Sequence, residues 1–95
     1  MGRRVSVIVI NEKDNVATAL DSLEAGASVP VKVGNRTERI RLISSIPKGH
    51  KFALTDIDAG SAVVKYGEPI GESRTKIARG EHVHVHNVTS RPRGG

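Results

Sequence analysis

The sequence predicts a small, mainly β domain with one or two short helices. Residues 5–10 read Val-Ser-Val-Ile-Val-Ile, and such β-branched runs favour strands. Gly34-Asn35 stands between two further strand-like runs, which is a hairpin signal. A short motif that ends in glycine recurs before several extended runs, and this pattern is typical of a compact, turn-rich β fold.

The length of 95 residues predicts one domain with a small core, because so short a chain buries only roughly 60 to 65% of its unfolded surface. Its 37% hydrophobic and 26% charged residues suit a folded soluble domain. We expect a cytoplasmic protein, since no run of about 18 apolar residues exists and the first residues do not resemble a signal peptide. The sequence contains no cysteine, which excludes disulfides and thiolate chemistry.

The formal charge of +5 is concentrated at the two ends of the chain. The terminal basic residues are Arg3, Arg4, Arg91 and Arg93. The remaining eleven of the 15 basic residues are nearly balanced by ten acidic ones. Phe52 and Tyr66 are too few aromatic residues for a platform that stacks on bases, so a nucleic-acid partner is not expected. The expected parts are a basic N-terminal arm (1–4), a domain (5–88) and a mobile C-terminal tail (89–95).

The segment after the first strand has the spacing of a short helix. Its apolar residues at helical spacing are Val16, Ala19, Leu20 and Leu23. Asp14 is placed to cap this helix and Gly26 to end it. The alternative is that the Asp14-Asn15 pair forms a turn that presents side chains to a ligand.

From Ser28 the pattern changes to two strands joined by Gly34-Asn35. The apolar residues expected in these strands are Val29, Val31, Val33, Ile40, Leu42 and Ile43. Arg39 and Arg41 alternate with the apolar residues of the second strand. They indicate either a solvated strand face or a contact with an anionic ligand.

An internal repeat consists of an apolar residue, two variable residues, a glycine and an extended run. The four copies are at 23–26, 46–49, 57–60 and 77–80. We expect each glycine to adopt a positive φ angle at a tight corner, because a residue with a Cβ enters that conformation at a cost of about 1 kcal/mol or more. Irregular spacing of the copies excludes a solenoid.

Candidate functional residues gather near the C-terminus. In an extended strand His82, His84 and His86 point to one face, with Cα atoms about 6.6 Å apart at every second residue. They can approach a metal ion, a carboxylate or a proton in transit, although a polar outer strand face is the alternative. A metal site from His84 and His86 with an acid such as Glu81 or Glu68 is conceivable, but three ligands are not encoded locally.

A second candidate segment is 65–71, Lys-Tyr-Gly-Glu-Pro-Ile-Gly. Its two glycines and its proline indicate a bend, and such bends often carry binding groups. Lys65 and Tyr66 are the groups of interest there. Histidine is the usual proton shuttle near neutral pH, and lysine binds carboxylates as a point charge. The sequence contains no phosphate-binding glycine loop and no nucleophile elbow.

The chain resembles the N-terminal segment of altronate and galactarate dehydratases, the UxaA family. The segments that carry the resemblance are Asp14-Asn15-Val16-Ala17, residues 46–54 (Ile-Pro-Lys-Gly-His-Lys-Phe-Ala-Leu), residues 65–71, and His84-Val85-His86-Asn87. Together they cover most of the chain from Val5 to Val88. In this family the segment is an SAF domain, the antifreeze-like β-clip module also found in sialic acid synthases and flagellar P-ring chaperones.

The resemblance implies a hydro-lyase that dehydrates sugar acids, in which a base removes the proton beside a carboxylate and an acid helps a hydroxyl group depart. By position, the implied catalytic residues are His84, His86 and Asn87. The implied substrate-binding residues are His50, Lys51, Lys65 and Tyr66. His82 departs from the family, which usually has a bulky aromatic residue there, so it is not counted as catalytic. A divalent metal ion, usually iron, is implied as a cofactor held mainly by a partner.

Family enzymes continue into a catalytic domain that this chain lacks. Sulfolactate sulfo-lyase divides the two parts between a small and a large subunit, and this chain resembles such a small subunit. The first hypothesis is therefore a subunit that is inactive alone and completes its site with a larger UxaA-type partner. The alternatives are a stand-alone module that binds a sugar acid or carbohydrate, and an adaptor with solvated histidines. A homodimer is plausible, and the substrate is left open among altronate, galactarate, sulfolactate and other acids.

Overall fold

The computed structural model describes residues 7–9 and 11–90, and within them the chain forms strands and turns without a helix. The strands are β1 (Val7–Ile8), β2 (Val16–Ala19), β3 (Ser28–Val33), β4 (Arg36–Arg41), β5 (Lys51–Ala53), β6 (Ala62–Lys65), β7 (Glu68–Ser73), β8 (His82–Val83) and β9 (Val88–Thr89). The predicted mainly β domain is therefore confirmed. No helix in this part of the chain is long and apolar enough to cross a membrane.

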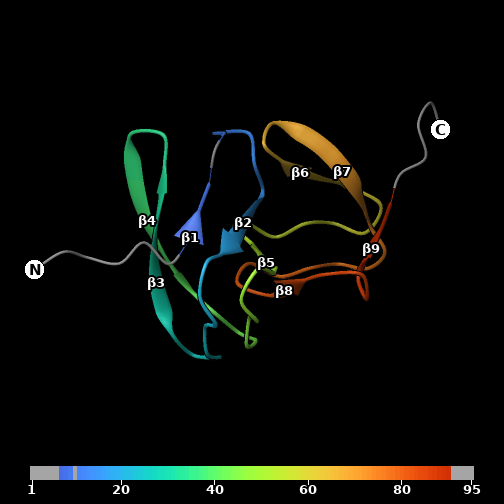
Figure 1. Cartoon of the computed structure of the whole chain (residues 1–95). Coiled ribbons are helices and arrows are strands. Elements are labelled where there is room, and N and C mark those ends of the chain that lie inside the picture. Colours follow the sequence, from blue (N-terminus) through green and yellow to red (C-terminus); the bar gives the residue numbers. More distant parts are fainter. Residues whose placement is uncertain (1–6, 10, 91–95) are drawn as a thin grey trace, which may run out of the picture.

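A central antiparallel sheet has the strand order β1-β2-β5-β8. The β3–β4 hairpin and the β6–β7 hairpin lie on opposite sides of this sheet (Figure 1). β9 pairs with β7 and extends the second hairpin to three strands. The expected arm at 1–4 and residues 91–95 of the expected tail lie outside the described residues, whereas Thr89 belongs to β9.

The helix expected after Asp14 is wrong, because these residues form β2. Val16 packs into one buried cluster while Ala17 and Ala19 pack into another. A strand alternates its side chains between two faces. Residues 16–19 can therefore contribute to both clusters only in an extended conformation. Leu20, which the helical spacing placed inward, is 39% exposed.

Asp14 and Asn15 attach β2 to the second hairpin instead of capping a helix. The Gly67 N–H donates to Asp14 Oδ1 at 2.8 Å. Asn15 accepts from the Val64 N–H at 2.7 Å and donates to the Ala62 carbonyl at 2.9 Å. These two side chains therefore hold the β6–β7 hairpin in position beside the central sheet.

The first hairpin agrees with its prediction. Val33 pairs with Arg36 across the Gly34-Asn35 turn, and the valines of β3 are buried on one face. Arg39 and Arg41 are exposed, as expected for a solvated strand face. Ile40 and Leu42 point into the core, whereas Ile43 is 56% exposed.

The four glycine corners are confirmed, with φ angles of 88°, 85°, 81° and 86° in chain order. Their apolar residues pair across the molecule, Leu23 with Ile46 and Ile57 with Ile77. The Gly49 N–H donates to the Ala19 carbonyl and the Gly80 N–H to the Ala53 carbonyl, each at 2.8 Å. The described part of the chain thus contains one unit twice. Each unit consists of a strand, a glycine corner, a hairpin and a second glycine corner. β5 follows the second corner of the first unit and is the first strand of the second unit.

Two buried clusters share this central sheet. The larger contains Phe52 and Ile40, and the smaller contains Val63 and Val83. Neighbouring residues of β5 face opposite clusters, since Phe52 belongs to the larger and Ala53 to the smaller. The pairing of β5 with β8 is what positions the candidate site.

Candidate functional site

All four histidines of the chain gather where β5 meets β8. Lys51 pairs with Val83 and Phe52 with His82 in an antiparallel register. Continuing that register by one residue places His50 opposite His84. Residues directly opposite on an antiparallel pair have Cβ atoms only about 5 Å apart, so the backbone alone brings these two imidazoles together.

The imidazole rings form a compact array. The His50 and His84 rings are stacked, with centroids 3.9 Å apart and 14° between their planes. His50 Nδ1 and His82 Nε2 are 2.8 Å apart and share a hydrogen bond. One of these nitrogens must accept the proton, so at least one of the two rings is neutral. The His86 ring lies 5.1 Å from that of His82 at a tilt of 34°.

The histidines do not come from one extended strand, as their alternation suggested. β8 ends at Val83 and the chain turns over residues 84–87. Asn87 holds this turn, since its Oδ1 accepts from the His84 N–H at 3.0 Å and its Nδ2 donates to the His82 carbonyl at 2.9 Å. Asn87 is buried and its side chain is bonded at both ends, so its structural role is to position His84 and His86.

Partial burial is the main cause of lowered basicity at the site. It lowers the pKa of His82, and the neighbouring His86, His50, His84 and Lys51 lower it further. The pKa of His84 is also lowered, first by loss of hydration and then by His50, Lys51 and His86. Both imidazoles are therefore neutral at pH 7, the form that accepts a proton or binds a metal ion.

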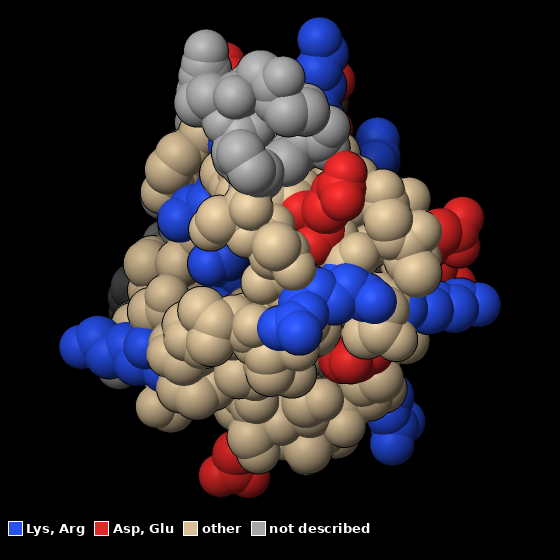
Figure 2. Space-filling view, turned by 90° about the vertical axis from the view of Figure 1, so that its right-hand side faces the viewer, with Lys and Arg blue, Asp and Glu red and all other residues tan. Residues whose placement is uncertain are grey.

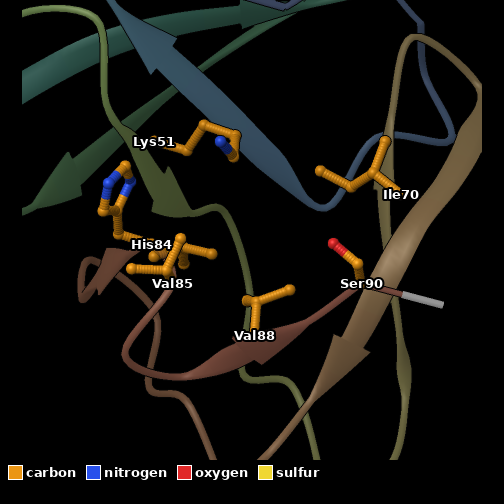
Figure 3. A pocket seen from close by; sticks show the side chains of 7 residues that line it. Lys51, Ile70, His84, Val85, Val88 and Ser90 are labelled. Atoms are coloured by element: carbon orange, nitrogen blue, oxygen red, sulfur yellow. The ribbon is translucent and has the colours of Figure 1, made fainter.

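A pocket of about 170 Å³ lies beside His84. Its lining residues are Lys51, Ile70, Val83, His84, Val85, Val88 and Ser90. Lys51 from β5 and His84 from the turn lie on one side of it, and Ile70 from β7 and Ser90 lie on the other (Figure 3). The Lys51 side chain and His84 thus border a hollow that is otherwise largely apolar.

The surroundings of Lys51 lower the pKa of its ammonium group. Burial lowers the pKa of Lys51, and the nearby Lys65 lowers it further. Both effects disfavour its charged form, and a bound carboxylate would reverse them. A carboxylate bound beside Lys51 would therefore favour the ammonium form of this side chain.

Lys65 and Tyr66 stand at the tip of the second hairpin. Lys65 Nζ lies 4.8 Å from the centroid of the Tyr66 ring, and Tyr66 is 52% exposed. Neither residue lines the pocket, although Lys65 is close enough to Lys51 to lower its pKa. On the side that carries this hairpin, basic and acidic side chains are interspersed (Figure 2).

The residues present fit a transition-metal ion. His50, His82 and His84 each offer a ring nitrogen, and these atoms lie within 4.8 Å of one another. Three protein ligands and one open position form the usual catalytic zinc-type site. The acids considered from the sequence do not join this set: Glu81 accepts from the Ala78 N–H at 2.8 Å, and Glu68 is exposed at the start of β7.

Sequence reasoning missed two features of this site. His82 was set aside, yet it bonds to His50 in the middle of the array. The His-x-His-x-His alternation is the sequence signal that would place His82 among the site residues. The apolar lining residues such as Ile70 and Val88 carry no chemical signature in a sequence, so only the fold identifies them.

Comparison with known proteins identifies the family of the chain. Residues 5–91 match the family described as the altronate/galactarate dehydratase SAF domain. Altronate dehydratase of Escherichia coli is 50% identical over 81 residues, and that of Bacillus subtilis is 39% identical over 83 residues. These matches cover 85% and 87% of this chain but 16% of each dehydratase. The chain thus spans about a sixth of the length of these relatives.

A third relative is similar along nearly its whole length. The (2R)-sulfolactate sulfo-lyase subunit alpha of Chromohalobacter salexigens is 34% identical over 87 residues, which cover 87% of this chain and 93% of that subunit. The resemblance drawn from the sequence motifs is confirmed by these matches. The chain belongs to the altronate/galactarate dehydratase SAF domain family.

Proposed function

We propose that the chain is the SAF-domain part of a sugar-acid lyase of the altronate/galactarate dehydratase type, whose active site is completed by a larger catalytic polypeptide. The observation that carries the proposal is the pairing of Lys51 and His84 on one side of the pocket. A cation that binds a carboxylate stands there next to an imidazole that accepts a proton. These are two of the functions that elimination from a hydroxy acid requires.

In the proposed reaction the C–H bond beside the carboxylate and the C–O bond of the adjacent carbon break, and a C=C double bond forms between these two carbons. Lys51 holds the carboxylate as a point charge. His84 takes the proton from carbon, because its lowered pKa keeps it neutral near pH 7. The hydroxyl group leaves as water with a proton from an acid on the partner. His50 and His82 orient the His84 ring, and His86 remains a second candidate for contact with the substrate.

A divalent metal ion, with iron favoured by the family, would stabilise the negative charge that develops on the substrate carboxylate. While His84 acts as the base, the residues of this chain that would hold the ion are His50 and His82. Lys65 and Tyr66 would bind the far end of a longer sugar acid from the hairpin tip.

A larger partner is supported by the surface around the pocket and by the relatives. Val85 and Ile70 on its rim are 73% and 38% exposed, which is apolar surface that a partner would bury. The sulfo-lyase relative carries the name of a subunit and has nearly the length of this chain. A 95-residue domain with an open pocket cannot exclude water by itself, and closure of a site strengthens its electrostatics.

The test is co-purification of the tagged full chain from its source cells under anaerobic, iron-replete conditions. The eluate is then assayed for β-elimination from altronate, galactarate and (2R)-sulfolactate. His84→Ala is expected to lower kcat/KM by about 100-fold or more, the range for loss of a general base. Lys51→Ala is expected to act mainly by raising KM.

The matched control is Lys32→Ala, which removes an exposed lysine of β3 on the opposite hairpin. It is expected to leave the activity unchanged. An inert eluate without a partner would overturn the lyase proposal. Lys51-dependent binding of a sugar acid by the chain alone would then favour the stand-alone binding module.

A further inference from the structure

We infer that this chain binds one divalent transition-metal ion by itself, through His50, His82 and His84. The observation is the cluster itself: three imidazole nitrogens from two separate segments lie within 4.8 Å of one another. His82, the residue that departs from the family pattern, completes the set. The inference is independent of the proposed reaction, because it concerns binding by the chain without a partner or a substrate.

Two of the three ligands already stand in a ligand-like arrangement. His50 Nδ1 and His82 Nε2 are 2.8 Å apart, whereas two nitrogens on a tetrahedral zinc ion are separated by about 3.3 Å, given zinc–nitrogen bonds of about 2.0–2.1 Å. The two rings are nearly parallel, with 18° between their planes. The ion would take the place of the proton that these nitrogens now share, and the rings need to part by only about 0.5 Å.

His84 must rotate to become the third ligand. Its ring lies over that of His50, with 14° between the planes and 3.9 Å between the centroids. A metal ion lies in the plane of each imidazole that binds it, so this ring has to turn about its Cβ–Cγ bond. Its place at the start of the 84–87 turn and its partial exposure allow that motion.

The donor set selects the class of ion. Three neutral imidazoles suit Zn²⁺, Fe²⁺, Co²⁺ or Ni²⁺, whereas Ca²⁺ and Mg²⁺ prefer oxygen ligands. His84 also lines the pocket that Lys51 faces. One of the three proposed ligands thus borders the pocket in which Lys51 would hold an anion.

The test is titration of the full chain with Co²⁺, followed by visible absorption, and with Zn²⁺, followed by calorimetry. The expected result is one ion per chain. His50→Ala and His82→Ala are each expected to weaken binding by at least about 10- to 100-fold, the range that loss of an outer-shell partner already produces. Circular dichroism verifies that each variant is folded.

The matched control is His86→Ala, which removes an exposed imidazole that contacts His82 but is outside the set. It is expected to leave the affinity within about threefold, since surface substitutions change free energies by only about 0.5 kcal/mol. Absence of saturable binding, or equal weakening by His86→Ala and His82→Ala, would overturn the inference.

A measurement on the unaltered chain keeps the test valid if a variant does not fold. Ring ¹⁵N resonances of His50, His82 and His84 are expected to shift on addition of Zn²⁺ more than those of His86. Shifts confined to His86 would contradict the proposed site. If the isolated chain binds no metal while its complex with a partner is an active lyase, this inference fails and the proposed function stands.

Discussion

Tyr66 has the least favourable backbone conformation among the described residues that carry a Cβ. Its φ angle is 57°, and the following Gly67 has a φ of 77°, so the two-residue turn of the β6–β7 hairpin has positive φ at both positions. Such turns favour Asn-Gly, and a bulky residue there costs about 1–2 kcal/mol. Strain of this kind concentrates at ligand-binding positions, which supports Tyr66 as a contact for the substrate.

Tyr66→Asn is therefore expected to stabilise the fold. The relief of strain exceeds the loss of the exposed Lys65–Tyr66 cation–π contact, which contributes about 0.5–1 kcal/mol. The net gain is expected to be about 0.5–1 kcal/mol in the free energy of unfolding, measured by urea denaturation. Tyr66→Phe keeps the strained backbone and the ring, and should change the stability little. A less stable Tyr66→Asn variant would show that the turn is not strained.

Three residues of the candidate site were predictable from the sequence, but their contacts were not. His84, Lys51 and His50 were chosen from the sequence, and the fold brings these three together. The contact of His50 with His84 depends on a strand register that joins residues 34 positions apart. No local pattern encodes such a pairing, because register follows from the burial of both strands together. The same reason hid the bonds of Asp14 and Asn15 to the second hairpin.

At the level of elements, the corners differ in how much room they leave. Gly49 and Gly80 have nearly equal φ angles of 85° and 86°. A Cβ on Gly49 would meet no atom within 4 Å, whereas a Cβ on Gly80 would overlap the carbonyl oxygen of Arg41. The fourth corner is thus pressed against the end of β4, and the Ile43 N–H also donates to the Gly80 carbonyl at 3.1 Å.

This contrast predicts two different costs for the same substitution. Gly49→Ala is expected to destabilise the fold by about 1–2 kcal/mol through the positive φ alone. Gly80→Ala adds about 1–3 kcal/mol for displacement of a packed neighbour. Thermal unfolding of the two variants under identical conditions provides the comparison. Equal melting temperatures would mean that the end of β4 shifts to accommodate the added methyl group without a loss of stability.

Strands and corners were predictable because their signals are local. The valines of β3 alternate and the four glycines mark positive φ angles. β2 was mistaken for a helix because Val16, Ala19, Leu20 and Leu23 satisfy helical spacing while Ala17, the residue that shows two-sided burial, is small. Alanine is compatible with either structure, so only the packing against β1 and β5 decided the outcome.

At the scale of the whole molecule, one ion-pair group joins the first hairpin to the fourth corner. Glu38 on β4 binds Arg36 at 2.8 Å and Arg79 at 3.5 Å, and Arg79 also donates to the Arg39 carbonyl at 3.2 Å. The hydrogen bond from Arg36 lowers the pKa of Glu38 below 4.5, with further contributions from the charges of Arg36 and Arg79.

The lowered pKa predicts a pH-dependent contribution to stability. Folding favours the ionised carboxylate, so the stabilisation is complete above the unfolded pKa and is lost as pH falls through the folded pKa. Glu38→Gln should therefore be less stable than the original chain at pH 7, and the difference should shrink below pH 4.5. Urea midpoints at pH 7 and at about pH 3 measure the change. Glu24→Gln, at an exposed corner position, is the control, and a Glu38→Gln difference independent of pH would refute the ion pair.

The repeated unit also determines where the amide protons of this protein are most strongly held. All four corner glycines donate their N–H groups to carbonyls of distant segments, at 2.7 Å for Gly26 and 2.8 Å for the others. The Gly26 and Gly60 bonds close the bases of the two hairpins, and the Gly49 and Gly80 bonds attach their corners to β2 and β5. We therefore expect them to open only when the core opens, whereas hairpin tips fray locally. In deuterated solvent the buried Gly80 and also the exposed Gly26, Gly49 and Gly60, at positions where rapid exchange is usual, would retain their protons for as long as the centre of the sheet.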